Sequence, residues 1–337
     1  MIPALVLTAG LATRLRPLSW VRAKAALPVG DRVIVQRILQ WLAAQGVAEA
    51  VLNLHHLPHT ISGILGDGAA EGVRVRYSWE MPVLGSAGGP RRALPLLSDR
   101  TFLIINGDTL TNVDIGALVD EHRKSDALVT MALVPNAEPA KYGGVVVHNG
   151  DVVGFTKAGS TEPSFHFVGV QVAEAAAFAS LPDNKPAESV NQLYPSLIAG
   201  RAGSIRGFVT DAEFFDIGTP RDYFETCMRF RTAEPPGLLE PREYRIPNPE
   251  SRIPNPGSLI PDPGSQPVST LEDCILWDDV EVDPHARLRR CILTDGVRVP
   301  GGSWENMIIR RAEGELLANE QRIHDLAIAP IDGTPVR

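Results

Sequence analysis

The chain is poor in cysteine and has no long apolar run, and each shortage excludes a class of protein. Only three of its 337 residues are cysteines, and they lack the close spacing of metal ligands. This pattern excludes a disulfide framework and fits a reducing compartment, so we expect a cytoplasmic protein. No stretch reaches 18 consecutive apolar residues, and no basic segment followed by an apolar one opens the chain. We therefore expect neither a membrane span nor secretion.

Acidic residues are absent from the first thirty positions, although the whole chain has a net charge of −8. The cations of this stretch are Arg14, Arg16, Arg22 and Lys24. An apolar run over residues 4–9 stops at Gly10, which predicts a buried strand followed by a tight turn. A turn of small residues with exposed amides and several cations suits a polyphosphate, whereas the plain alternative is a solvated basic loop. The acidic overall balance argues against nucleic acid as a partner.

The alternation of strands and helices indicates the fold class. A helical pattern across Asp31–Gln45 separates the first strand from a second apolar strand at Glu49–Leu54. Strand, helix and strand within about fifty residues form a βαβ unit, which predicts a parallel sheet with right-handed crossovers. Further along the chain, Asn149 and Gly150 suit a type I′ turn between two strands, and we expect a helix near Ala173–Ser180.

The opening stretch resembles the N-terminal signature of the sugar-1-phosphate nucleotidyltransferases, or NDP-sugar pyrophosphorylases, commonly G-x-G-T-R-L-x-P-L-T followed by K-x-x-x-P. The matching residues are Gly10, Thr13, Arg14, Leu15, Pro17, Leu18, Lys24 and Pro28. Ala12 stands at the usual second glycine and Ser19 at the usual threonine. The resemblance implies a catalytic domain over residues 1–232, of the α/β class, with a Rossmann-like, mixed and mostly parallel sheet.

The same resemblance implies roles for residues at this turn. It implies a nucleotide that lies along Ala9, Gly10, Leu11 and Thr13. It also implies that Arg14 contacts the leaving pyrophosphate and that Lys24 contacts the α-phosphate. A methyl group at Ala12 limits how closely the backbone can approach a phosphate.

A second segment of small residues follows a predicted strand at Val73–Ser78 and consists of Gly85, Ser86, Ala87 and Gly88. Small side chains let a flat heterocycle lie against the backbone, whose amides and carbonyls can read its edge. A plain strand-to-helix loop is the alternative, because the glycines alone would permit it. The stretch from Glu80 to Pro90 resembles the family's E-x-x-x-L-G-T-A-G-P segment, which implies that the four small residues bind the nucleobase.

Two aspartates are candidate metal ligands. Asp108 follows an apolar strand at Thr101–Ile105, at the sheet edge where α/β proteins bind ligands, and its hard carboxylate suits Mg²⁺. Taken alone, this aspartate also fits an Asx turn. Asp216 lies in an apolar run, which is unfavourable unless the carboxylate meets a cation or a hydrogen-bond donor. Both match aspartates of the family's G-D and D-I-G-T-P motifs, so the resemblance implies that Asp108 and Asp216 bind Mg²⁺.

A group of histidines, His55, His56 and His59, is another candidate metal site. Pro58 interrupts helical i, i+4 pairing, and no carboxylate sits alongside. We therefore favour a short helix that begins at Pro58.

The resemblance also implies a sugar-phosphate site made of Gly143, Lys157 and Gly169. Gly143 lies in a stretch similar to the family's Y-G-x-V, and Lys157 matches the lysine that binds the sugar phosphate. Gly169 lies in a segment that fits the strand where many members carry N-A-G.

Three departures from the family pattern support an alternative function. Ala12 replaces a glycine, Thr156 stands where a glutamate precedes the lysine, and Phe167 stands at the asparagine. These changes favour a non-catalytic regulatory relative that binds NDP-sugars. A glycosyltransferase is a third hypothesis, but the D-x-D metal motif that this chemistry usually needs is absent after Ile105.

The C-terminal third contains two different repeats. Residues 233–268 are rich in proline, with a seven-residue repeat over Arg245–Ser265, and we expect a linker. Cys274–Val282 returns as Cys291–Val299, and this period of 17 residues predicts stacked coils of short strands. The repeat resembles the left-handed β-helix of many family members, here over residues 269–311, followed by a tail over residues 312–337. Two coils cannot bury a core alone, so they must pack on the catalytic domain or on another subunit of a homo-oligomer.

The combined matches predict an enzyme that makes an NDP-sugar and pyrophosphate from an NTP and a sugar 1-phosphate, with Mg²⁺ as cofactor. The Leu84–Pro90 stretch resembles mannose-1-phosphate guanylyltransferases and the related uridylyltransferases more than thymidylyltransferases. With the resemblance to a β-helix tail, it implies GDP-mannose made from GTP and mannose 1-phosphate as the first expectation. The alternatives are a uridylyltransferase or another nucleotidyltransferase acting on glucose 1-phosphate or N-acetylmuramic acid 1-phosphate. Neither nucleic acid nor a membrane is expected as a partner.

Overall fold

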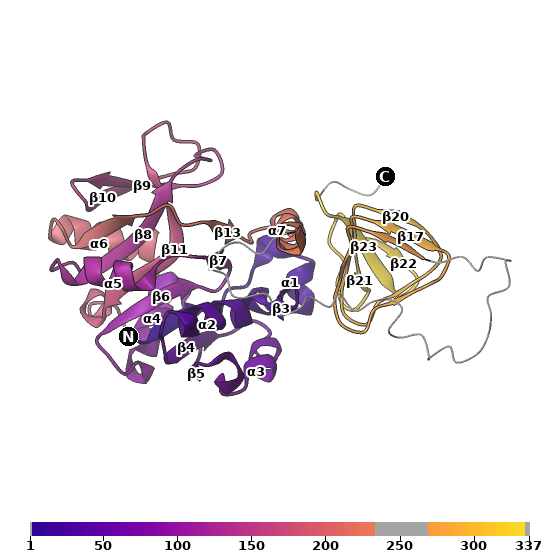
Figure 1. Cartoon of the computed structure of the whole chain (residues 1–337), viewed down its shortest axis with the longest axis horizontal. Coiled ribbons are helices and arrows are strands. Elements are labelled where there is room, and N and C mark those ends of the chain that lie inside the picture. The colour runs from indigo at the N-terminus through magenta and orange to yellow at the C-terminus, as the bar shows by residue number, and fades with distance from the viewer. Residues whose placement is uncertain (1, 233–268, 334–337) are drawn as a thin grey trace.

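The computed structural model describes residues 2–232 and 269–333, and the two ranges form units of different architecture. Residues 2–232 form an α/β unit, and residues 269–333 form a stack of short strands beside it (Figure 1). The proline-rich linker expected over residues 233–268 lies outside the described residues. Within the described ranges, no helix combines the length and the apolarity needed to cross a bilayer.

A nine-stranded sheet forms the centre of the α/β unit (Figure 1). In spatial order its strands are β5 (Arg74–Trp79), β4 (Glu49–Leu54), β1 (Ala4–Leu7), β6 (Thr101–Asn106), β11 (Phe165–Glu174), β8 (Val129–Pro135), β12 (Ile205–Val209), β10 (Asp151–Thr156) and β9 (Gly144–His148). The first four strands of this order run parallel, and so do β8 and β12. β11 is antiparallel to β6 and β8, and β10 is antiparallel to β12 and β9. The sheet is mixed, as expected, but less parallel than expected.

Helices cover both faces of this sheet because its central strands are apolar on both sides. On β6, Leu103 and Ile105 belong to one apolar cluster, whereas Phe102 and Ile104 belong to the other. Alternate residues of a strand point to opposite faces, so burial on both faces requires a layer on each side. The helices are α1 (Leu18–Val21), α2 (Ile34–Ala44), α3 (His59–Leu65), α4 (Gly85–Ala93), α5 (Ile115–Arg123), α6 (Tyr194–Gly200) and α7 (Pro220–Thr232).

Two local expectations have opposite outcomes. Asn149 and Gly150 join β9 to β10 with φ angles of 52° and 85°, as the predicted type I′ turn requires. A helix expected near Ala173–Ser180 is wrong, because β11 runs into this segment and only a short 3₁₀ turn over Ala175–Phe178 follows. Ala173 pairs with a strand on either side, so its apolar neighbours are buried by the sheet and not by a helical face.

The strands of residues 269–333 stack as successive coils, with like residues above one another. One face contains β14 (Thr270–Glu272), β17 (Ala286–Arg289) and β20 (Gly302–Glu305), a second contains β15 (Ile275–Leu276), β18 (Ile292–Leu293) and β21 (Met307–Arg311), and a third contains β16 (Glu281–Val282) and β19 (Arg298–Val299). Within each face, the strands named here are parallel. Ile275 lies opposite Ile292, which lies opposite Ile308. The repeat in the sequence is therefore a repeat in the structure, and Figure 1 shows the stack nearly end-on.

The stacked unit continues beyond residue 311 and packs on the α/β unit. β22 (Gln321–Ile323) and β23 (Leu326–Pro330) lie in the segment expected as a separate tail, but β23 pairs with β21. Residues 321–330 of the expected tail therefore add two antiparallel strands to the stacked unit. Ile275, Trp277 and Ile292 of the coils join the main apolar cluster of the α/β unit. This contact supplies the burial that two coils lack on their own.

An ion pair buried in the stacked unit leads to a prediction about stability. Arg310 Nε and Nη2 each lie 2.7 Å from a carboxylate oxygen of Glu320, and both side chains are almost fully buried. Replacing Glu320 with glutamine leaves a buried guanidinium without its counter-charge, so we expect the free energy of unfolding to fall by about 3 kcal/mol. Urea unfolding followed by tryptophan fluorescence measures this loss.

Glu313→Gln is the matched control, because Glu313 pairs with Arg311 at 3.0 Å on the surface. We expect this substitution to change the free energy of unfolding by less than about 1 kcal/mol. Equal effects of the two substitutions would show that burial of the Arg310 pair contributes nothing.

Candidate active site

The turn after β1 keeps an open backbone at its first glycine. Gly10 is exposed, and no atom lies within 4 Å of the place where a Cβ would be. Ala12 adopts a left-handed conformation, with φ of 46° and ψ of 47°. That conformation is unfavourable for alanine by about 1 kcal/mol, and it explains why glycine is usual at this position. Ser19 Oγ donates to the Ala12 carbonyl at 2.9 Å, so the turn is held although the second glycine is missing.

The two predicted metal ligands lie next to each other. β7 (Thr109–Thr111) pairs antiparallel with β13 (Phe214–Asp216), which brings Asp216 beside the residue that follows Asp108. The Ile217 amide donates to the Asp108 carbonyl at 3.2 Å. Burial raises the pKa of Asp216, and the charge of Asp108 raises this pKa further. Two carboxylates in such a place form a site that favours a cation.

Lys24 and Arg14 face these carboxylates. Lys24 Nζ lies 2.5 Å from Asp108 Oδ2. A Cβ built on Gly218 would lie 3.5 Å from both Arg14 Nη2 and Asp216 Oδ2, so these two side chains flank the same glycine. The structure therefore brings together the four residues predicted to bind metal and phosphates, from three distant segments of the chain.

The ends of β1 and β6 set where these groups meet. The Gly107 amide donates to the Leu7 carbonyl at 3.0 Å, which joins the end of β6 to the end of β1. A Cβ on Gly107 would lie 2.5 Å from that carbonyl oxygen, so a larger residue would push the strands apart. Asp108, the residue after Gly107, therefore lies directly beside the turn that follows β1.

The segment predicted to bind a nucleobase also has a packing role. Gly85 begins α4 with a φ angle of 76°, and both Gly85 and Ser86 are partly exposed. Ala87 and Gly88 are buried, and their amides donate to the Ala187 carbonyl at 2.9 and 3.2 Å. The amides of Ala87 and Gly88 are therefore occupied. Of the four residues, Gly85 and Ser86 are the two that are partly exposed, and the Ser86 hydroxyl already donates to Glu188 Oε2 at 2.7 Å.

A buried hydrogen-bond network, which sequence reasoning missed, joins the strand ends around this site. Asn53 Oδ1 accepts from the Thr8 amide at 2.6 Å, and Asn53 Nδ2 donates to Glu80 Oε1 at 2.8 Å. Glu80 Oε2 accepts from the Leu84 amide at 2.7 Å. The network links the ends of β1, β4 and β5 to the start of α4. Its sequence signal is a polar residue where a strand ends, Asn53 in β4 and Glu80 after β5.

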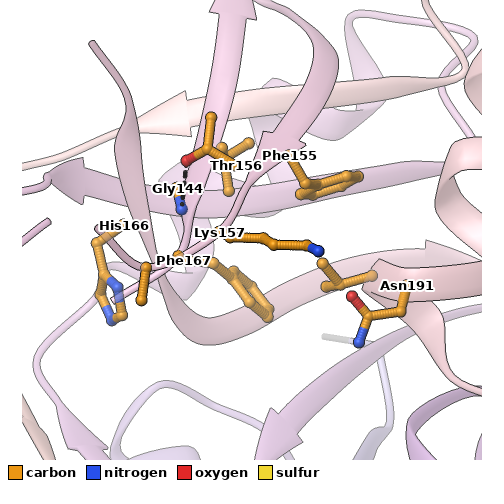
Figure 2. Close-up of a pocket in the computed structure, with 11 residues that line it drawn as sticks. Gly144, Phe155, Thr156, Lys157, His166, Phe167 and Asn191 are labelled. Carbon is orange, nitrogen blue, oxygen red and sulfur yellow. Dashed lines mark hydrogen bonds between the residues drawn. The ribbon is translucent and has the colours of Figure 1, made fainter. Parts of the chain in front are cut away.

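A pocket of about 390 Å³ contains the lysine predicted to bind the sugar phosphate (Figure 2). Gly143 and Lys157 both line it. In Figure 2 the Lys157 side chain extends between the rings of Phe155 and Phe167 toward Asn191. The pocket therefore has aromatic walls around one ammonium group.

Gly169, the third residue predicted to bind the sugar phosphate, lies outside the lining of the Lys157 pocket. It has a φ angle of 81° in the irregular part of β11, and a Cβ there would lie 2.9 Å from Asn106. Among the described residues that line the Lys157 pocket, Gly169 is absent. It packs instead on the end of β6, close to Asp108 in sequence. His166, which does line the pocket, stacks on Phe214 with ring centroids 4.6 Å apart, and so connects the pocket to β13.

Two of the three histidines after β4 form hydrogen bonds with backbone carbonyls. His55 Nδ1 lies 3.0 Å from the Glu80 carbonyl oxygen, and His56 Nε2 lies 2.6 Å from the Ser19 carbonyl oxygen. Pro58 stands at the start of α3, as expected. In residues 2–232 and 269–333, no three or more His, Cys, Asp or Glu side chains are grouped so as to hold a metal ion. A metal at the Asp108–Asp216 pair would therefore need other ligands, such as phosphate oxygens and water.

The chain is similar to nucleotide-sugar enzymes over most of its length. A mannose-1-phosphate guanylyltransferase from Mycobacterium tuberculosis is 28% identical over 305 residues, which cover 89% of this chain and 82% of that protein. A D-glycero-alpha-D-manno-heptose 1-phosphate guanylyltransferase from Aneurinibacillus thermoaerophilus is 30% identical over 222 residues, 65% of this chain and 94% of that protein. A UTP–glucose-1-phosphate uridylyltransferase from Synechocystis is 27% identical over 239 residues, 66% of this chain and 61% of that protein.

The α/β unit shares its fold with solved structures. The crystal structure of HddC from Yersinia pseudotuberculosis, complexed with GMP-PN, has a TM-score of 0.60 at 24% identity and covers 68% of this chain and 100% of that chain. This likeness shows the fold alone. The nucleotidyl transferase family model matches residues 3–232, a range that includes Arg14, Lys24, Asp108 and Asp216. The chain therefore belongs to the nucleotidyl transferase family and is an enzyme of the sugar-1-phosphate nucleotidyltransferase type.

Proposed function

We propose that the enzyme makes GDP-mannose and pyrophosphate from GTP and mannose 1-phosphate. The observation that carries the proposal is the convergence of Arg14, Lys24, Asp108 and Asp216 beside the turn after β1. The guanylyltransferase from Mycobacterium tuberculosis, named for mannose 1-phosphate, matches 89% of the chain, more than the α/β unit alone. The uridylyltransferase relative matches 66%. This difference in coverage favours guanylyl transfer to a mannose phosphate.

The reaction needs positioned phosphates and no general base. The ionised phosphate oxygen of the sugar 1-phosphate attacks the α-phosphorus of GTP in line, a new P–O bond forms, and the bond to the bridging oxygen breaks as pyrophosphate leaves. Negative charge develops on oxygens, so preorganised cations lower the barrier. We assign Lys24 to the α-phosphate, Arg14 to the leaving pyrophosphate and Lys157 to the sugar phosphate. The open backbone at Gly10 would lie along the triphosphate.

Mg²⁺ is the cofactor that suits Asp108 and Asp216. Burial and the neighbouring Asp108 charge raise the pKa of Asp216. Nearby cations therefore do not fully compensate the negative charge of the two carboxylates. Mg²⁺ accepts one or two carboxylates and takes phosphate oxygens and water as its other ligands. When bound, the ion would neutralise charge on the phosphates. The Lys24 ammonium, 2.5 Å from Asp108, would keep that carboxylate oriented.

The Lys157 pocket supports a second candidate substrate. Phe155, Phe167 and Val190 give the pocket apolar walls beside Lys157 and Asn191. An acylamino or ether group on the sugar would bury apolar surface against these walls, whereas hexose hydroxyls need hydrogen-bond partners. Uridylyl transfer to N-acetylmuramic acid 1-phosphate is therefore the second candidate function.

We also propose that the stacked coils are a short left-handed β-helix and that the enzyme works in the cytoplasm. The register of strands in successive coils supports the first statement. The three cysteines are free thiols, which supports a reducing compartment. Association of the coils into a homo-oligomer stays a prediction.

Pyrophosphate release tests the proposed function. Purified protein is incubated with Mg²⁺, each of four nucleoside triphosphates, and each of mannose, glucose and N-acetylmuramic acid 1-phosphate. We expect the highest kcat/KM for GTP with mannose 1-phosphate. The highest value for UTP with N-acetylmuramic acid 1-phosphate would favour the second candidate, and no release from any pair would favour a regulatory relative.

Asp108→Ala should lower kcat by about a hundredfold to a thousandfold, because charge on the reacting phosphates loses its stabilisation. Pyrophosphate release measures the rate, and circular dichroism measures whether the fold is kept. Asp120→Ala is the control, because Asp120 lies on α5 with its side chain 70% exposed. Turnover of the Asp108 variant at the wild-type rate would refute the assigned role.

His166 gives a prediction about pH. It packs between Tyr142 and Phe214, and burial, aided by the Lys141 charge, lowers its pKa from 6.5 to about 4. Between these values the unfolded chain binds a proton at this position and the folded chain does not, so the free energy of unfolding rises with pH. We expect His166→Gln to remove about 2 kcal/mol of this rise.

Urea unfolding of the wild type and the variant at several pH values between 4 and 6.5 checks this expectation. His148→Gln, at the exposed end of β9, controls for the substitution itself. An unchanged slope in the His166 variant would mean that this histidine titrates alike in the folded and unfolded chains.

A further inference from the structure

Arg22, the first residue of the turn that contains Lys24, is held in place by side chains of the stacked coils. Arg22 lies two positions before Lys24, and its side chain is 12% exposed. Its Nε and Nη2 donate to the two carboxylate oxygens of Asp295 at 2.8 and 2.5 Å, and Nη2 also lies 2.6 Å from Asp278. Asp278 and Asp295 are 17 residues apart and occupy equivalent positions in successive coils. A planar guanidinium that donates hydrogen bonds to two carboxylates in this way is held in one orientation.

The coils also reach the far end of the same turn. The Trp277 ring lies 5.3 Å from Arg22 Cζ, and Trp277 Nε1 donates to the Tyr223 hydroxyl oxygen at 3.0 Å. That hydroxyl in turn donates to the Pro28 carbonyl at 2.6 Å. Trp277 and Tyr223 are 5% and 0% exposed, so water does not compete for these bonds. One side chain of the coils is therefore connected to both ends of the segment from Arg22 to Pro28.

Between these anchors the backbone has little freedom. Ala25 and Ala26 are buried, and the Ala23 amide donates to Thr60 Oγ1 at 3.1 Å. Lys24 projects from this segment and reaches Asp108 at 2.5 Å. The place of the Lys24 ammonium therefore depends on how the ends of the turn are held.

A neighbouring contact has the same effect on α1, the helix that precedes the turn. The Trp20 ring lies 5.0 Å from Cζ of Arg310, which belongs to β21 of the coils. Arg16 Cζ lies 5.5 Å from the same ring. The coils thus contact Trp20 and Arg22, and both residues lie in the segment between Arg14 and Lys24.

We propose that Arg22, Asp278, Asp295 and Trp277 are positioning residues that set the place of Lys24, so that the docked coils complete the active site of their own chain. The expected effect on turnover rests on the proposed function, whereas the effect on the turn does not. Without the contacts of Arg22 with Asp278, Asp295 and Trp277, Lys24 can move relative to Asp108 and the phosphates. A misplacement of about 1 Å is enough to lower turnover about a hundredfold.

The test replaces both acids at once in the full chain, as Asp278→Asn with Asp295→Asn. The matched control is Glu281→Gln with Glu305→Gln, which also removes two carboxylates from the coils. These control residues pair with Arg298 and Arg289, which belong to the coils themselves and not to the α/β unit. Both proteins are compared with the wild type by steady-state kinetics and by hydrogen–deuterium exchange of the amides of residues 23–27.

We expect the amides of residues 23–27 to exchange about tenfold faster in the Asp278/Asp295 variant, because local opening becomes easier. We expect kcat to fall about tenfold to a hundredfold, with KM for the sugar 1-phosphate within about twofold of the wild type. The control variant should match the wild type in both measurements. Adding Arg22→Gln to the double variant should lower kcat much less than the double substitution does, because Arg22 then loses only its contact with the Trp277 ring.

Unchanged exchange in the Asp278/Asp295 variant would overturn the anchoring of the turn. Faster exchange with unchanged kcat would overturn the positioning of Lys24. An equal loss of kcat in the control variant would assign the effect to general destabilisation of the coils. If the wild type releases no pyrophosphate from any substrate pair, the proposed function fails, and the exchange comparison still decides whether the coils anchor the turn.

Discussion

Two carboxylates held next to each other in a partly buried place are the constraint on which the rest of the site depends. The short pairing of β7 with β13 brings Asp216 to Asp108, and burial together with this neighbour raises the pKa of Asp216. Packing of the α/β unit does not require such a pair, since buried charge opposes folding unless it is compensated. Lys24 and Arg14 supply part of the compensation. A divalent ion with phosphate oxygens would supply the remainder, which is why the pair indicates phosphate chemistry.

The elements around this site were predictable where they depend on residues close in sequence. The strand over Glu49–Leu54 and the turn at Asn149 and Gly150 formed as expected. The 17-residue repeat also predicted the stacked coils, because each coil repeats the contacts of the one before. The helix expected near Ala173–Ser180 failed because an apolar run buried between two strands looks the same as the buried side of a helix.

The residues that we propose to bind phosphate could be named from the sequence because they match a motif, but contacts between distant segments could not be predicted. Nothing near Ala87 and Gly88 in the sequence indicates that their amides are bound to the Ala187 carbonyl. Likewise, no local pattern pairs Arg22 with Asp295, which lies 273 residues further along the chain. Such contacts depend on how the coils dock on the α/β unit, and this docking is a property of the whole fold.

The most direct measurement follows Mn²⁺, a paramagnetic substitute for Mg²⁺, as it binds in the presence of GTP and broadens the phosphorus signals of the nucleotide. The central claim is that Asp108 and Asp216 hold one divalent ion against the polyphosphate. We predict GTP-dependent binding of Mn²⁺ with broad phosphorus signals in the wild type, and loss of most of this binding in Asp216→Asn. Equal Mn²⁺ binding and equal broadening in the two proteins would contradict the claim.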